Sequence, residues 1–206
     1  MKAGGTLSRE RMAAYFSVLG SIPEQVEVTD MFGVPLDISS ALGNATEMMR
    51  ATHDAGNKLI FIGNGGSAAI ASHMAIDYTK NGRLRALAFN DGPSLTCLGN
   101  DLGYEHVFEH QISMHARPGD LLVAISSSGK SPNILAAVAA AKEQSCEVIT
   151  LSGFKPDNAL RRLGQINFYV ARTEYGFVEV SHLVLCHAIL DLAMGWGQEG
   201  SLPNGA

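Results

Sequence analysis

The sequence lacks the features that mark secreted, disulfide-rich or membrane proteins. It has three cysteines, Cys97, Cys146 and Cys186, which are widely spaced and set among apolar neighbours. This pattern predicts reduced core side chains rather than disulfides or a cysteine metal cluster. No apolar run reaches membrane-spanning length, and the first residues lack the apolar core of a signal peptide. We therefore expect a cytoplasmic protein with no membrane partner.

Positive charge is also scarce. Lys and Arg number 15 against 20 Asp and Glu, which gives a formal net charge of −5 over 206 residues. Because nucleic acids are held largely by positive charge, this balance argues against a nucleic-acid partner. Hydrophobic residues make up 46% of the chain, which is typical of a single globular domain with a substantial core.

Strand and helix patterns alternate from Lys58 onward, which predicts an α/β fold with a parallel sheet. The expected strands are Leu59 to Ile62, Ala86 to Phe89, Leu121 to Ile125, Val148 to Leu151 and Ile166 to Val170. The expected helices are Ala68 to Lys80, Tyr104 to His115, Pro132 to Glu143, Asn158 to Leu163 and Phe177 to Trp196. We predict that residues 58–196 form one doubly wound, flavodoxin-like domain with a five-stranded sheet of order 2-1-3-4-5.

The regions on either side of this domain have different patterns. Residues 1–57 predict two helices, Ser8 to Leu19 and Ile38 to about Ala55, joined by a loop or short irregular strand over residues 20–37. Because these helices precede the sheet, we expect the extension to pack on the sheet and on neighbouring subunits. Residues 197–206 are polar and glycine-rich, which predicts a flexible tail.

Two loops contain the groups that suit a phosphate. Gly63 to Ser67 follows the first predicted strand, and Ser126 to Ser131 follows the third. In a doubly wound sheet these loops meet at the carboxyl ends of the strands, where free N–H groups, hydroxyls and helix dipoles favour an anion. The glycine loop matches neither a Walker loop nor a dinucleotide fingerprint, so no nucleotide cofactor is expected. The simpler alternative is that the glycines only allow the chain to turn.

Groups that could transfer protons lie on two predicted helices. His73 and Asp77 are four residues apart and share a helix face, and Glu179 and His187 lie on one stripe of the last helix. His187 falls in an apolar run, where an imidazole without a partner is costly. Each residue alone is compatible with a surface or core role. Only a shared pocket would make the set functional.

Four segments in order carry a resemblance to a known family. They are GNGGSAAIASHMAIDY, NDGPSLTCLGNDLGYEHVF, GDLLVAISSSGKSPNILAAVAAAK and VEVSHLVLCHAIL. Together they resemble the sugar isomerase (SIS) fold and, within it, the phosphoheptose (sedoheptulose-7-phosphate) isomerase family. The similarity extends from roughly residue 40 to residue 195.

The resemblance implies an aldose–ketose isomerase that acts on a phosphorylated sugar through an enediolate, in the synthesis of lipopolysaccharide or polysaccharide precursors. It also implies a homotetramer with sites at subunit interfaces. The substrate-binding residues implied by position are Asn64, Gly65, Gly66, Ser67, Asn100, Asp101, Ser126, Ser127, Ser128 and Ser131. The last four would hold the phosphate, and the Gly-Asn-Asp turn that ends at Asp101 would contact sugar hydroxyls.

The family's catalytic and metal-binding positions are partly altered in this chain. By the resemblance, the catalytic glutamate falls on Asp77, the catalytic histidine on His187, and the other metal ligands on His73 and Glu179. The family has a glutamate where Asp77 stands and a glutamine where Glu179 stands. Either carboxylate could be the base, and all four side chains could hold zinc.

Two alternatives remain open because of these substitutions. The chain could be a non-catalytic SIS-fold factor that binds a phosphosugar or another protein. It could also be an isomerase for a different heptose or octose phosphate. The pair of histidines with two carboxylates favours catalysis, since a scaffold has no need of such ionisable groups.

Overall fold

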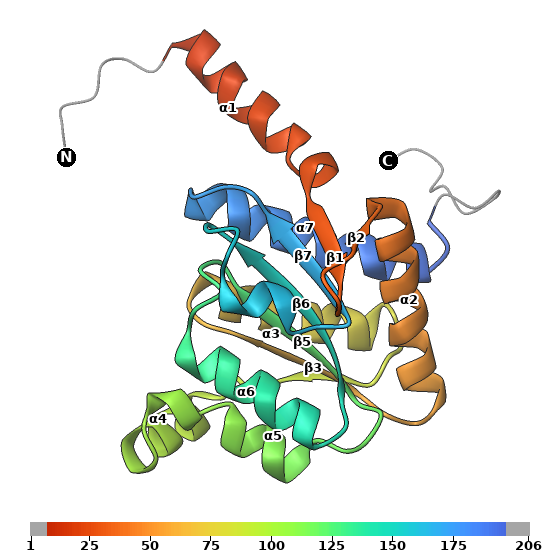
Figure 1. Ribbon diagram of the computed structural model, residues 1–206, viewed down its shortest axis with the longest axis vertical. Coiled ribbons are helices and arrows are strands. Elements are labelled where there is room, and N and C mark those ends of the chain that lie inside the picture. The colour runs from red at the N-terminus through yellow and green to blue at the C-terminus, as the bar shows by residue number, and fades with distance from the viewer. Residues whose placement is uncertain (1–7, 197–206) are drawn as a thin grey trace.

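A seven-stranded sheet organises the computed structural model, which describes residues 8–196 (Figure 1). The strands are β1 (Glu27–Asp30), β2 (Pro35–Leu36), β3 (Leu59–Gly63), β4 (Ala86–Ala88), β5 (Leu121–Ser126), β6 (Glu147–Gly153) and β7 (Ile166–Val170). Their order across the sheet is β2-β1-β7-β6-β5-β3-β4. The five strands from β3 to β7 pair in parallel, and in their own numbering they have the predicted order 2-1-3-4-5.

The predicted count of five strands was too low, because the segment expected as a loop or irregular strand forms β1 and β2. Strand β1 pairs antiparallel with β7, so that Val28 lies opposite Phe168, and β2 pairs antiparallel with β1. The turn between β1 and β2 is held by Asp30, whose Oδ1 accepts hydrogen bonds from the N–H groups of Phe32 and Val34. The sheet is therefore mixed rather than purely parallel.

The α-helices are α1 (Arg9–Ser21), α2 (Ile38–Asp54), α3 (Gly66–Lys80), α4 (Gly92–Asp101), α5 (Glu109–His115), α6 (Pro132–Glu143) and α7 (Tyr175–Ala193). Short 3-10 helices are η1 (Pro23–Gln25), η2 (Tyr104–His106) and η3 (Ala159–Arg162). Helix α4 was not predicted from the sequence. Asp91 caps it, since its carboxylate accepts from the N–H of Ser94, and Pro93 occupies its first turn. The helix predicted over Tyr104 to His115 is divided into η2 and α5.

Helices cover both faces of the sheet and enclose two hydrophobic cores. One core joins α2, α3 and α7 to strand side chains such as Phe61 and Val123. The other joins α5 and α6 to the alternate side chains Ile62 and Ala124. This alternation follows from the two-residue period of a strand. Among the described residues, α7 is the one helix that is long and apolar enough to cross a membrane, and the core helices of soluble proteins share this length and composition.

The two N-terminal helices behave differently. Helix α2 packs against α7 and the sheet through buried residues such as Ala45 and Met49. Helix α1 extends away from the sheet (Figure 1), and none of its residues is buried within residues 8–196. Tyr15 contacts the ring of Phe177, with the ring centroids 4.7 Å apart. Packing of the extension on neighbouring subunits stays a prediction, and the predicted tail over 197–206 lies outside the described residues.

Candidate active site

A cavity of about 250 Å³ lies between the two loops predicted to meet at the carboxyl ends of β3 and β5. The loop residues that line it are Asn64, Gly65, Gly66, Ser67, Ser126, Ser127, Ser128 and Ser131. The structure thus brings together the two loops that the sequence had singled out. Two residues of the α7 region, Tyr175 and Glu179, complete the lining. Tyr175 was missed by the sequence analysis.

Three positions of the glycine loop leave no room for a larger side chain or need a backbone conformation that favours glycine. Gly65 has a φ of +54°, which favours glycine, and a Cβ on Gly63 would lie 2.5 Å from the backbone of Ser67. A Cβ on Gly66 would lie 2.5 Å from the carboxylate of Glu179. This carboxylate therefore lies directly against the amino end of α3, where the helix dipole is positive.

The serine loop contains a hydroxyl without a partner. The Ser126 Oγ accepts a hydrogen bond from the Gly129 N–H at 3.2 Å, and the Ser128 Oγ accepts from the Lys130 N–H at 3.3 Å. In contrast, the Ser127 Oγ is buried and has no hydrogen-bond partner within residues 8–196. Leaving a buried hydroxyl unpaired costs about 1–3 kcal/mol. A phosphate oxygen in the cavity would satisfy it.

A buried asparagine that the sequence analysis missed supports the serine loop from behind. Asn158 packs against Gly129 so closely that a Cβ on this glycine would lie 1.9 Å from the Asn158 Oδ1. Its Nδ2 donates to the Lys155 carbonyl at 2.9 Å, and the Gly129 carbonyl accepts from the N–H of Leu160. An asparagine in a short polar loop carries no signal in the sequence that would reveal this role.

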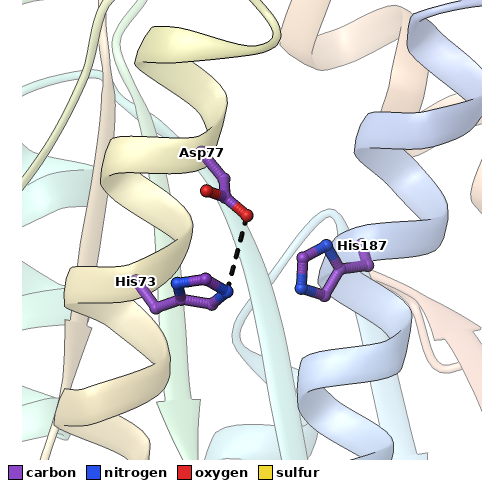
Figure 2. Close-up of side chains that lie close together, drawn as sticks. All are labelled: His73, Asp77 and His187. Atoms are coloured by element: carbon purple, nitrogen blue, oxygen red, sulfur yellow. Dashed lines mark ion pairs between the residues drawn. The ribbon is translucent and has the colours of Figure 1, made fainter.

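A second group of side chains lies between α3 and α7 (Figure 2). The potential ligand atoms of His73, Asp77 and His187 all lie within 4.8 Å of one another. The His73 Nε2 is 3.4 Å from the Asp77 Oδ2, and the two imidazole centroids are 5.4 Å apart. Two imidazoles and one carboxylate are a typical donor set for a catalytic zinc, so these residues fit a divalent metal.

The fourth predicted metal ligand, Glu179, lies in the cavity rather than in this group. Glu179 and His187 are eight residues apart on α7, which corresponds to about 12 Å along the helix axis. Both residues lie on α7. The sequence did not indicate that the side chain of Glu179 is directed toward Gly66.

The two predicted sugar-binding residues lie elsewhere. The Gly-Asn-Asp segment was expected to form a turn, but Asn100 and Asp101 are instead the last residues of α4. Both are exposed, and the Asn100 Nδ2 donates to the Asp101 Oδ1 at 2.7 Å. Neither residue lines the cavity formed by the described part of the chain. Their contact with a substrate stays a prediction.

His182 belongs to the interior and not to either group. It is fully buried, its Nε2 is 3.1 Å from the Ser152 carbonyl oxygen, and its Nδ1 has no partner in the described range. Burial lowers the pKa of His182 to about 4. The imidazole is therefore neutral at pH 7, and its Nε2–H donates to Ser152.

Comparisons with known proteins agree with this geometry. A family model described as the SIS domain matches residues 36–153. The phosphoheptose isomerase of Citrifermentans bemidjiense is 33% identical over 162 residues, which cover 76% of this chain and 84% of that protein. The chain belongs to the phosphoheptose isomerase family. The family member from Rhodospirillum rubrum is 37% identical over 162 residues, with 76% and 86% of the two chains covered.

The fold is also that of solved family members. The structure of the phosphoheptose isomerase from Neisseria gonorrhoeae has a TM-score of 0.75 and 32% sequence identity, and the match covers 90% of this chain and 98% of that one. The predicted fold family is confirmed. So is the predicted class of enzyme, a phosphosugar isomerase of the aldose–ketose type, at the level of the family.

Proposed function

We propose that this phosphosugar isomerase converts sedoheptulose 7-phosphate, or a closely related heptose or octose phosphate, between its ketose and aldose forms through an enediolate. The observation that carries the proposal is the buried, unpartnered Ser127 hydroxyl in a cavity of serines and glycines. Such a cavity suits a phosphate, and the two helices beside it hold the groups needed for proton transfer.

The size of the cavity indicates which part of the substrate it would hold. Its volume of about 250 Å³ lies below the ~300–1,000 Å³ of pockets that enclose a whole small molecule. We infer that the cavity holds the phosphate end. The sugar chain would then extend along α3 and α7, because both helices start at the cavity and carry His73, Asp77 and His187 further along.

The length of the sugar fits this arrangement. Ser67 and His73 are six residues apart on α3, which is about 9 Å along the helix. The six carbon–carbon bonds of a seven-carbon sugar, each about 1.5 Å long, give the extended chain a similar reach. The carbonyl end would therefore lie near the two imidazoles while the phosphate remains in the cavity.

Proton transfer needs a base and an acid on the two sides of the carbonyl. Asp77 and Glu179 are the candidate bases, and His187 is the acid partner. Asp77 lies beside both imidazoles, but its carboxylate is one bond shorter than a glutamate, and a displacement of about 1 Å can lower a rate roughly a hundredfold. Glu179 lines the cavity proposed to hold the phosphate. Asp77 is therefore closer to the proposed position of the carbonyl.

His73, Asp77 and His187 would hold a divalent metal, and their donor set favours zinc, with Glu179 the remaining candidate for a fourth ligand. When bound, zinc supplies Lewis-acid stabilisation of the enediolate charge. The proposal expects about one divalent metal per chain in protein purified without chelator. His187→Ala should lower the metal content, and the exposed His110→Ala should not. Equal metal content in the two variants would contradict the assignment.

The face that bears these residues is a candidate subunit interface. Val180 and Val184 share one face of α7 with His187, and together with Ile76 beside Asp77 they are 40–56% exposed. Exposed apolar side chains around a potential catalytic group favour cover by a second copy of the chain. We propose a homotetramer in the cytoplasm in which neighbouring subunits complete each site, which is also what the family resemblance implies.

The test is isomerisation of a panel of ketose and aldose phosphates in deuterated water. The proposal expects deuterium at the carbon beside the carbonyl, and fastest exchange with a heptose or octose phosphate. Asp77→Asn and Glu179→Gln should be compared separately and together, and the single variant with the larger loss identifies the base. Binding of a sugar phosphate without exchange would instead support the non-catalytic alternative.

A further inference from the structure

A second hollow lies at the opposite edge of the sheet from the candidate active site. Its volume is about 460 Å³, and we call it the amino-end pocket because Lys58, Arg85 and Asp120, which directly precede β3, β4 and β5, line it. Arg117 and His115 form another part of its wall. Nothing in the proposed isomerase chemistry uses these residues.

The charges in this pocket do not cancel. Asp120 is 1% exposed, and its carboxylate pairs with the ammonium of Lys58 while accepting hydrogen bonds from the N–H groups of Lys58 and Arg117. Its charge is therefore neutralised by Lys58. Neither Arg85 nor Arg117 forms an ion pair with any residue in the range 8–196. Three cations face one carboxylate, so the pocket has two excess positive charges in a chain of net charge −5.

The guanidinium of Arg85 is held in place while most of its donors remain available. The Arg85 Nη1 donates to the carbonyl of Gly56 at 2.7 Å, and the backbone N–H of Arg85 donates to the Nδ1 of His53 at 3.3 Å. A guanidinium has five N–H donors in a fixed fork that matches the oxygens of a phosphate. One bond to a carbonyl leaves the fork able to bind an anion.

Two apolar side chains, Leu87 and Phe89, form part of the wall of the pocket, beside the polar Asn57. Leu87 and Phe89 come from the edge strand β4 and the residue that follows it, and the ring of His115 lies 5.9 Å from that of Phe89. The volume falls within the ~300–1,000 Å³ of small-molecule pockets. We propose that the amino-end pocket binds a small phosphate ester, with the phosphate on Arg85 and Arg117 and the organic part on Leu87 and Phe89.

This site is separate from the candidate active site. Strand β3 has five residues and β5 has six, and each leads from the amino-end pocket to one of the two loops of the serine cavity. At about 3.3 Å per residue these strands separate the two sites by roughly 16–20 Å. One small molecule cannot reach both, so the inference does not depend on the proposed isomerase activity.

The test is isothermal titration of the full-length chain with inorganic pyrophosphate. We expect two sites per chain. Arg85→Gln combined with Arg117→Gln should remove or weaken one of them at least about tenfold, since each substitution removes charge-assisted hydrogen bonds to the phosphate. Ser127→Ala should weaken only the other site. Arg50→Gln combined with Arg83→Gln changes the net charge equally at exposed arginines outside the pocket, and it should leave both sites intact.

The salt dependence gives a second readout that requires no variant. Binding at the amino-end pocket should weaken as ionic strength rises, because its recognition is largely electrostatic. A single site per chain that only Ser127→Ala weakens would overturn the proposal. So would wild-type stoichiometry and affinity in the Arg85/Arg117 variant, with folding of each variant verified by its thermal unfolding.

Discussion

The side-chain amides of Asn64 and Asn133 hydrogen-bond to each other in both directions, and each Nδ2 donates to the other Oδ1 at 2.9 Å. The hydroxyl of Tyr104 adds a third bond to the Asn64 Oδ1 at 3.0 Å. Because Asn64 is in the glycine loop and Asn133 is in the first turn of α6, the pair fixes the two walls of the cavity relative to each other. The side chain of Asn64 is thus occupied by the protein itself.

Replacing Asn133 with alanine should loosen this connection. Asn133 is 2% exposed, so Asn133→Ala leaves the Nδ2 of Asn64 without its acceptor and should lower the free energy of unfolding by about 1–3 kcal/mol. It should also raise KM for the sugar phosphate more than it lowers kcat. Urea unfolding and steady-state kinetics measure the two effects. The exposed Asn81→Ala serves as the control, and an equal response of the two variants would show that the amide pair has no such role.

Ser127→Ala should separate binding from stability. The Ser127 hydroxyl has no partner in the described residues, so its removal should leave the free energy of unfolding nearly unchanged or slightly higher. The loss of a hydrogen bond to a charged phosphate should raise KM about tenfold or more, with little effect on kcat. The exposed Ser113→Ala should change neither quantity. An unchanged KM in Ser127→Ala would exclude the serine loop as the phosphate site.

Gly129→Ala should damage the loop through its backbone. Gly129 has a φ of +60°, and a Cβ there would lie 1.9 Å from the Asn158 Oδ1. We expect the free energy of unfolding to fall by about 1–3 kcal/mol, and substrate binding to weaken. Gly43→Ala is the matched control, because Gly43 lies inside α2 with no described atom within 4 Å of the added Cβ. It should stabilise the protein by about 0.5–1 kcal/mol. Similar effects of the two substitutions would contradict this account of the loop.

His182 should make the protein sensitive to acid. Burial lowers the pKa of His182 to about 4 in the folded state, whereas its pKa in the unfolded chain is about 6.5. Between these two values the unfolded chain binds a proton on His182 that the folded protein does not bind. The stability that depends on neutral His182 is complete above about pH 6.5 and is lost as the pH falls toward 4, by roughly 3 kcal/mol.

His182→Gln removes this titration but retains a donor for the Ser152 carbonyl. Urea unfolding at pH 7 and near pH 4.5 should show a smaller loss of stability in this variant than in the wild type. The exposed His110→Gln should keep the wild-type dependence. If His182→Gln and the wild type lose the same stability, the imidazole is not the group that responds.

The sequence could predict the parallel core and the meeting of the two loops, because both follow from strand order and short-range patterns. The apolar strands and the crossover helices identify β3 to β7, and the glycines and serines that follow β3 and β5 mark the cavity. Strands β1 and β2 could not be predicted in the same way. They are short, polar in part, and exist through antiparallel pairing with β7, which is distant in the chain.

The residue patterns alone could predict the candidate site only to the level of helix faces. The four-residue spacing of His73 and Asp77 predicted that they share a helix face, and the family resemblance assigned His187 to the same group. The structure brings the three side chains together, although His187 comes from a helix more than 100 residues away. The direction of the Glu179 side chain and the roles of Asn133 and Asn158 depend on tertiary contacts. A periodic pattern contains no information on such contacts.

The most direct test of the central claim is the structure of the protein with a bound, non-isomerisable heptitol 7-phosphate. The account predicts phosphate oxygens within hydrogen-bond distance of the Ser127 Oγ, with the other end of the same molecule in contact with His187. A phosphate bound away from the serine loop, or a ligand that reaches Ser127 while His187 stays out of contact in every subunit of the assembly, would contradict it.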